Sequence, residues 1–264
     1  MNTNYEEFDN VVQKQFEIYR DNSSMLFDYL ATGVENGFES IQFSFYRANY
    51  FYRTYATIPS ICILLKAAAE REDEHTLRSA GQNLQEELGL IEGNKKSHAE
   101  LLRFSHNTHG ERVFNLPSIS LRDSLNSDFI LPTTKTFKKV QHNLYTSRNY
   151  IEILAANYAQ EAAAVEMLNN FLNAFFKPYS GFYQSKQEFL DIIEYFTCHL
   201  DGLEQRHAED AKRNLFKQCK STNDVRIAVL ALKKMLSAQS NMWNELQIGL
   251  SKLENIEQII LTNA

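Results

Sequence analysis

The sequence contains few of the residues that make tight turns, with nine glycines and four prolines among 264 residues. An all-β protein needs many turns, so this scarcity argues against one. Charged residues make up 23% of the chain, and the formal net charge is only −6, so neither positive nor negative residues are in large excess. Phosphate binding requires a concentrated basic surface, so we expect no nucleic-acid partner.

Cysteines and long apolar runs are also scarce. The three cysteines, Cys62, Cys198 and Cys219, are widely spaced and form no CxxC motif, which favours a reducing compartment. The first ten residues, MNTNYEEFDN, lack the apolar core of a signal peptide. The longest apolar run, residues 58–69, is interrupted by Pro59 and Lys66 and is too short for a membrane span. The sequence therefore predicts a cytoplasmic protein that does not insert into membranes.

Apolar residues recur at helical spacing through most of the chain, and no strand-like alternation or internal repeat is evident. Residues 150–176 are rich in Ala and Leu, and a further helix is predicted from about residue 186 to 217. The irregular segment 105–136 is interpreted as loops and short helices, because neither side of it looks complete alone. The sequence predicts a single all-α domain over residues 1–264, a bundle of about seven or more helices.

Residues 38–55 are dense in aromatic side chains. Such a stripe is most often part of a core, and the functional alternative is the wall of a substrate pocket. On that alternative, Tyr46, Tyr50 and Phe51 are the candidate pocket residues. Tyr46, Tyr50 and Tyr52 are also candidates for redox-active tyrosines.

The stretch YFTCHLDGLEQRHAEDA, residues 195–211, carries a possible metal-binding motif. Glu204 and His207 lie three residues apart and therefore share a helix face. A carboxylate and an imidazole at this spacing suit a borderline transition metal, although an isolated pair of this kind more often lies on the surface. His199 lies roughly 80° round a continuous helix from His207, and a π-bulge would restore its phase.

Other candidate ligands are found in both halves of the chain. Glu161 stands in an Ala-rich helix, where a buried carboxylate is costly unless it is paired or binds a metal. Glu87 precedes a helix-breaking glycine, and His98 opens the next predicted helix. The remaining histidines are interpreted as ordinary surface or capping residues: His75, His106, His109 and His142.

In this order, the segments NLQEELG, KKSHAELLRF, an Ala-rich helix with a Glu, and H…ExxHAEDA resemble the haem-oxygenase-like di-iron oxidases and oxygenases. Among these, the CADD-like branch is most similar, and the resemblance covers roughly residues 80–212. It implies a haem-oxygenase-like fold that holds two Fe2+ ions and uses O2 to oxidise or cleave a small organic substrate. The substrate would be an amine, an amino acid or a fatty acid, and a homodimer is the common state of such proteins.

The resemblance also implies a set of iron ligands. Asn83, Glu87 and Gly89 match the family's N-x-x-x-E-x-G pattern, which makes Glu87 a ligand, and Glu161 would bridge the irons. The chain departs from the pattern at Leu200, where the family has a histidine, and His199 stands one residue early with Asp201 as a weaker substitute. The implied ligands are Glu87, His98, Glu161, His199, Glu204 and His207.

Three alternatives stay open on the sequence alone. A ferritin-like bundle would use Glu72 and His75 as a second ExxH motif. A TenA-like hydrolase of cofactor metabolism would use Cys198 as a nucleophile. A non-enzymatic interaction protein on the same fold would explain the displaced His199.

Overall fold

The computed structural model describes residues 5–91 and 96–262, and every regular element in these ranges is helical. The all-α prediction is therefore confirmed. None of the described helices is both long and apolar enough to cross a bilayer. The helices are α1 (Tyr5–Asn36), α2 (Ser40–Thr54), α3 (Thr57–Ala69), α4 (Glu74–Glu87), α5 (His98–Phe114), α6 (Pro132–Tyr145), α7 (Tyr150–Ala162), α8 (Ala164–Phe171), α9 (Lys186–Leu200), α10 (Leu203–Gln218) and α11 (Thr222–Thr262).

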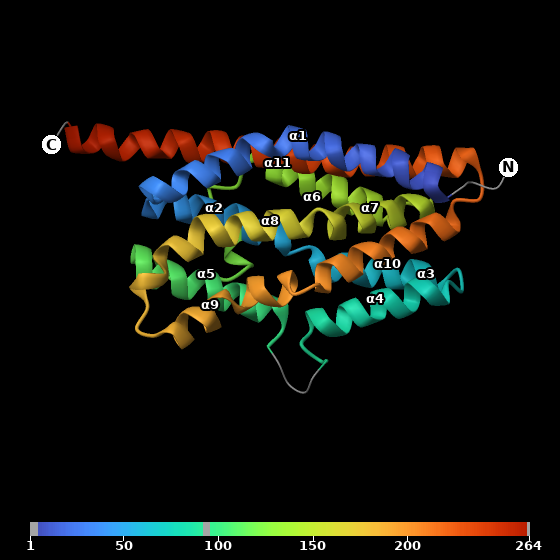
Figure 1. Cartoon of the computed structure of the whole chain (residues 1–264), viewed down its shortest axis with the longest axis horizontal. Helices are drawn as coiled ribbons and strands as arrows, with labels where there is room; N and C mark the ends of the chain where they lie inside the picture. The colour runs from blue at the N-terminus through green and yellow to red at the C-terminus, as the bar shows by residue number, and fades with distance from the viewer. Residues whose placement is uncertain (1–4, 92–95, 263–264) are drawn as a thin grey trace.

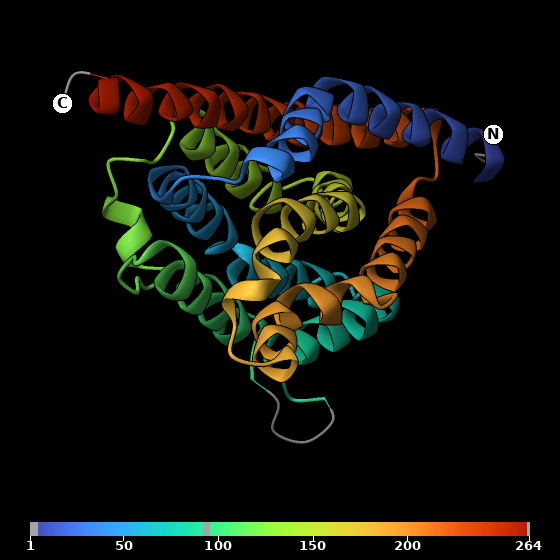
Figure 2. The same ribbon diagram turned by 60° about the vertical axis from the view of Figure 1, so that its left-hand side comes forward.

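The first and last helices, α1 and α11, run side by side in the same direction along one edge of the molecule (Figures 1 and 2). Side-chain hydrogen bonds join the two helices at several points. Trp243 Nε1 donates a hydrogen bond to the Tyr19 hydroxyl at 3.1 Å, and Ser23 donates to Ser240 at 3.2 Å. This pair covers the bundle on the side away from α4, α5 and α9.

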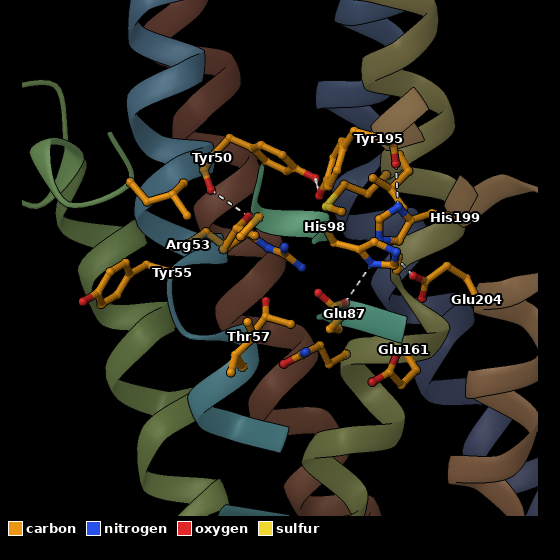
Figure 3. Close-up of a pocket in the computed structure, with 18 of the residues that line it drawn as sticks. Tyr50, Arg53, Tyr55, Thr57, Glu87, His98, Glu161, Tyr195, His199 and Glu204 are labelled. Atoms are coloured by element: carbon orange, nitrogen blue, oxygen red, sulfur yellow. Dashed lines mark hydrogen bonds and ion pairs between the residues drawn. The ribbon is translucent and has the colours of Figure 1, made fainter. Parts of the chain in front are cut away.

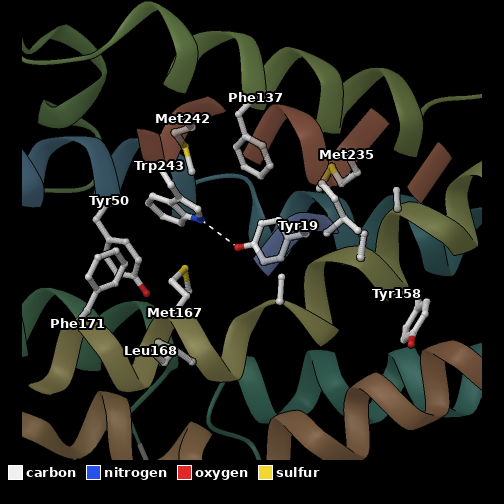
Figure 4. Close-up of a cluster of buried hydrophobic side chains, with 14 of the residues drawn as sticks. Tyr19, Tyr50, Phe137, Tyr158, Met167, Leu168, Phe171, Met235, Met242 and Trp243 are labelled. Carbon is white, nitrogen blue, oxygen red and sulfur yellow. Dashed lines mark hydrogen bonds between the residues drawn. The ribbon is translucent and has the colours of Figure 1, made fainter. Parts of the chain in front are cut away.

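The aromatic stripe of α2 enters one continuous buried cluster (Figure 4). Tyr46 stacks on Phe175 with ring centroids 4.1 Å apart, and Tyr50 meets Phe171 edge to face at 5.4 Å. Trp243 from α11 packs against Phe171 at 5.5 Å. The interpretation of the stripe as core is confirmed for most of its residues.

Two segments that the sequence predicted as continuous helices are broken. The predicted helix over residues 186–217 is divided into α9 and α10 at Gly202, whose φ of 105° lies in the left-handed region. The Ala-rich segment is divided into α7 and α8 at Ala163, and its continuation, Leu172–Phe176, forms a π-helical turn. Each of the first two breaks lies beside a candidate ligand, as described below.

Candidate metal centre

The structure brings all six candidate ligands together in two groups of three. One group holds Glu87, His98 and His199, and the other holds Glu161, Glu204 and His207. Within each group, one nitrogen or oxygen atom from every residue lies within 4.8 Å of the others, so each group can hold a metal ion. The side chain of Glu204 also reaches the first group, because its Oε1 lies 3.7 Å from Nε2 of His199.

Five of these six residues lie in the first or last turn of a helix. Glu87 is the last residue of α4 and His98 is the first of α5. Glu161 lies in the last turn of α7, His199 in the last turn of α9 and Glu204 in the first turn of α10. Helix ends therefore converge on the site, and each end aims one or two ligands into it.

The break at Gly202 sets the position of His199. A continuous helix would place His199 out of phase with His207, and a π-bulge was the expected remedy. Instead the chain leaves the helix at Asp201 and Gly202 and restarts at Leu203. This change of direction brings His199 to Glu204. The helix break, and not the expected π-bulge, therefore places His199.

Glu161 is held in place by Asn83 of α4. The Asn83 side-chain amide donates a hydrogen bond to Glu161 Oε1 at 3.2 Å. The other carboxylate oxygen, Oε2, lies 3.9 Å from Nδ1 of His207. The asparagine of the sequence motif therefore orients a carboxylate that lies 78 positions further along the chain.

His207 is oriented by Glu86, a residue that the sequence did not distinguish from its neighbours. Nε2 of His207 lies 2.5 Å from Glu86 Oε2, while Arg206 donates to the other oxygen of Glu86 at 2.6 Å. A histidine that gives one ring N–H to a carboxylate offers its other nitrogen to a metal. Here Nδ1 of His207 is the nitrogen that turns toward Glu161.

The two histidines of the first group are also oriented. His199 donates its Nδ1–H to the Tyr195 carbonyl at 2.5 Å, which leaves Nε2 with a free lone pair. His98 places Nδ1 3.4 Å from Glu87 Oε1, and the sulfur of Cys198 lies 4.0 Å from its Nε2. Each histidine therefore presents one nitrogen to the carboxylates and the other to a neighbour outside the group.

The charges of the metal-free site are poorly compensated. Burial, followed by repulsion from Glu204 and Glu87, raises the pKa of Glu161 well above its usual value. Burial also raises the pKa of Glu204, although His199 and His207 act against it. Burial opposes protonation of His98, but Cys198 and Glu87 raise its pKa to about 10. These shifts favour the protonated forms of Glu161, Glu204 and His98. Three carboxylates with three imidazoles fit borderline divalent metals.

Two buried ligand atoms of the candidate set make no hydrogen bond within the described part of the chain. They are Oε2 of Glu204 and Nδ1 of His98, one from each group. Buried polar atoms normally have a partner. Metal ions bound to the two groups would supply the missing partners, so the residues present fit a pair of metal ions.

A cavity of about 330 Å3 opens beside this cluster (Figure 3). All the candidate ligands except His207 line this cavity, namely Glu87, His98, Glu161, His199 and Glu204. The opposite wall is formed by the end of α2 and the start of α3, with Tyr50, Arg53 and Thr57. The hydroxyls of Tyr50 and Tyr195 are hydrogen-bonded to each other at 3.0 Å at one end of the cavity.

Of the three predicted pocket residues, only Tyr50 lines the cavity. Tyr46 and Phe51 are fully buried in the aromatic core and are not among the described residues that line the cavity. The cavity lies at the C-terminal end of α2, and Tyr46 is one turn too early to reach it. Tyr52 lies on another face of α2, where Lys138 sits 4.5 Å above its ring.

Two histidines predicted to lie on the surface or at helix caps are instead fully buried. His106 donates Nδ1–H to the Leu102 carbonyl at 3.1 Å and accepts a hydrogen bond from Tyr46 at 3.0 Å. Burial holds the pKa of His106 well below its usual value and lowers that of His109 to about 3. Both are neutral core residues. The sequence signal for this burial was the set of aromatic residues on α2 that pack against the two histidines.

The ferritin-like alternative fails on the position of its second motif. Glu72 lies in an exposed turn with a φ of 55°, and His75 is exposed on the first turn of α4. Neither residue lines the cavity or belongs to either group of candidate ligands. The ExxH motif of Glu72 and His75 therefore belongs to an exposed, charged segment of the surface.

Comparison with known proteins shows similarity at the level of structure. No protein-family model and no curated protein matches the sequence. A crystal structure of a CADD-like protein of unknown function from Nostoc punctiforme aligns with a TM-score of 0.69 at 16% identity, over 92% of this chain and 98% of that chain. A second crystal structure of the same protein aligns with a TM-score of 0.68 at 15% identity, over 94% of this chain and 97% of that chain.

A domain of unknown function from Shewanella denitrificans, described as having a heme oxygenase-like fold, aligns with a TM-score of 0.63 at 15% identity. The alignment covers 96% of this chain and 95% of that chain. Identities this low show the fold alone, and the alignments run over nearly the whole length of each chain. The chain therefore has the haem-oxygenase-like fold that its sequence motifs predict.

Proposed function

We propose that this protein is a non-haem di-iron oxidase or oxygenase that acts on a small organic substrate. The observation that carries the proposal is the convergence of three histidines and three carboxylates in two adjoining groups at the wall of a cavity. Mixed imidazole and carboxylate donors of this number suit two Fe2+ ions. When bound, the iron pair supplies the electrons and the open coordination positions that O2 activation requires.

The chain's own residues would hold and shield this chemistry. Glu86 and Asn83 orient His207 and Glu161, and the Tyr195 carbonyl orients His199. Glu204 lies near residues of both groups, so its carboxylate would help to hold either ion. The cavity offers a partly enclosed volume in which a substrate displaces water next to the ligands.

Two competing hypotheses receive less support from the structure. Cys198 lies against His199 and His98, and although burial raises its pKa, these histidines lower it to about 7. However, Cys198 does not belong to the described lining of the cavity, which a nucleophile would need to reach. The hypothesis of a non-enzymatic protein depended on a displaced His199, and that histidine lies with the other candidate ligands.

Oxygen uptake tests the proposal. The protein is produced without oxygen, supplied with Fe2+ and then exposed to O2 in an oxygen electrode. We expect O2 consumption by the wild type and its loss in His207→Ala. The matched control is His142→Ala, because His142 is exposed on α6 away from the site. Iron binding without oxygen consumption, or equal consumption by both variants, would contradict the proposal.

A further inference from the structure

Arg53 is a buried cation at the edge of the cavity. It lies in the last turn of α2, is only 9% exposed, and lines the same cavity as the candidate ligands. Figure 3 shows its guanidinium pointing across the cavity toward Glu87 and His98. Its position therefore faces any molecule that occupies the space next to the metal centre.

No hydrogen bond or ion pair to Arg53 is present within residues 5–91 and 96–262, and its Nε is buried without a partner. The Arg53 guanidinium instead makes cation–π contacts. Its carbon lies 5.7 Å from the ring centroids of both Phe137 and Trp243. The other buried arginine of α2, Arg47, donates to the Asn107 side chain at 3.2 Å. A buried guanidinium is rarely left without a hydrogen-bonding partner, because desolvation of its charge is costly.

The start of helix α3 adds to the positive character of this wall. Thr57, Ile58 and Pro59 form the first turn of α3 and line the cavity beside Arg53. The N-cap residue, Ala56, makes no side-chain cap. Thr57 and Ile58 carry backbone N–H groups, whereas Pro59 has none. The first turn of a helix also carries a partial positive charge, which attracts anions. Arg53 and this uncapped helix end therefore face the same space.

The charge of the loaded site favours an anion as well. Two divalent ions would bring one positive charge more than the carboxylates of Glu87, Glu161 and Glu204 can balance, and Arg53 adds another. A cationic amine placed in this cavity would meet only unfavourable charge on the Arg53 side. A carboxylate would match the guanidinium, which binds planar carboxylates through two parallel hydrogen bonds.

We propose that Arg53, with the N-terminal turn of α3, binds the carboxylate of the substrate, so that the cavity takes an organic carboxylate rather than a simple amine. This inference rests on the proposed function and narrows its substrate class to fatty acids and amino acids. The apolar remainder of the substrate lies against Ile58, Leu121, Met167 and Leu168, which also line the cavity. The carbon atoms next to the carboxylate then face the candidate metal ligands across the cavity.

Binding to the zinc-loaded protein tests this inference without any turnover. The probes are octanoate, 2-aminooctanoate, octylamine and 1-octanol, measured by calorimetry and by fluorescence of Trp243, the only tryptophan in the chain. We expect the wild type to bind octanoate or 2-aminooctanoate at least roughly tenfold more tightly than 1-octanol, and octylamine least. The stronger of the two carboxylates identifies the substrate as a fatty acid or an amino acid.

Variants at Arg53 separate carboxylate recognition from a structural role. In Arg53→Gln we expect carboxylate binding to weaken roughly ten- to a hundredfold while 1-octanol binding is unchanged, with Arg53→Lys intermediate. The control is Arg71→Gln, since Arg71 stacks 4.8 Å above Tyr150 and does not line the cavity. Equal binding of octanoate and 1-octanol by the wild type would overturn the inference, and so would equal loss of both in Arg53→Gln.

Zinc content and binding without metal keep this result separate from the proposed function. A protein that binds no zinc but prefers octanoate through Arg53 would contradict the di-iron proposal and support the carboxylate site. A protein that binds zinc but shows no preference for carboxylates would support the metal centre and contradict the carboxylate site. Carboxylate binding that survives Arg53→Gln and disappears with zinc would assign the carboxylate to the metal and overturn the role of Arg53.

Discussion

Glu86 and His207 are 121 positions apart in the chain, yet Glu86 Oε2 lies 2.5 Å from Nε2 of His207. This contact fixes which ring nitrogen of His207 faces the carboxylates of the site. Glu86 does not belong to either group of candidate ligands, and Arg206 balances its charge. The geometry therefore gives Glu86 a positioning role that can be measured apart from ligation.

We predict that Glu86→Gln lowers metal affinity about 10- to 100-fold while all six candidate ligands remain in place. The neutral amide cannot stabilise the imidazole as a carboxylate does, and it allows the ring to turn. Competition with a chromogenic chelator measures the change. Glu209→Gln is the control, because Glu209 is exposed on the same helix as His207. Unchanged affinity in Glu86→Gln would show that His207 needs no such partner.

Replacing Glu161 by glutamine should make the metal-free protein more stable at pH values above the usual titration range of carboxylates. The pKa of Glu161 is raised above its ordinary 4.5, mainly by burial, so its folded state binds a proton that the unfolded state releases. The wild type therefore loses stability as pH rises above about 4.5 toward the raised pKa, whereas Glu161→Gln does not lose this contribution. Urea unfolding at pH 4 and pH 7 measures the effect.

We expect wild type and Glu161→Gln to unfold at similar urea concentrations at pH 4, and the variant to be the more resistant at pH 7. The exposed Glu194→Gln serves as the control for removing a carboxylate. A variant that is less stable than the wild type at pH 7 without metal would contradict the direction of the pKa shift.

Gly202→Ala should disturb the site through the backbone. Gly202 has a φ of 105°, and a Cβ there would meet no atom within 4 Å, so strain rather than collision is the cost. We expect a loss of about 1–2 kcal/mol in the free energy of unfolding. Metal affinity should also fall, because His199 and Glu204 lie on either side of this residue.

Gly81→Ala is the matched control for Gly202→Ala. Gly81 lies inside α4, no atom would lie within 4 Å of the added Cβ, and its φ is not positive. The free energy of unfolding of Gly81→Ala should rise by about 0.5–1 kcal/mol, because alanine has a higher helix propensity than glycine. Similar effects of the two substitutions in thermal and chemical unfolding would refute the role of the left-handed break.

Cys198→Ala should keep most of the oxygen uptake of the iron-loaded protein. Cys198 contacts His199 and His98 from outside the cavity, so its removal costs packing but no ligand and no nucleophile. Oxygen-electrode measurements compare the variant with the wild type. Substrate-protected inactivation by iodoacetamide, lost in Cys198→Ala but not in the exposed Cys62→Ala, would favour the hydrolase instead.

The sequence predicted the helical fold because helical spacing is a local property. The set of six distant candidate ligands came from the resemblance to haem-oxygenase-like proteins, not from spacing alone. It could not predict how Gly202 would place His199, since a helix break and a π-bulge both correct the same phase error. The roles of Glu86 and Arg53 depend on contacts with residues far along the chain. His106 was misjudged for the same reason, because its burial comes from the aromatic face of α2.

Metal stoichiometry tests the central claim most directly. The metal-free protein is titrated with Co2+ in the absence of oxygen, followed by visible absorption, and its metal content is then determined by elemental analysis. The two groups of ligands predict close to two ions per chain in the wild type, with weakened binding in Glu204→Ala, which removes the carboxylate that contacts both groups. A wild type that binds no stoichiometric metal, or that binds it equally well without Glu204, would contradict this account.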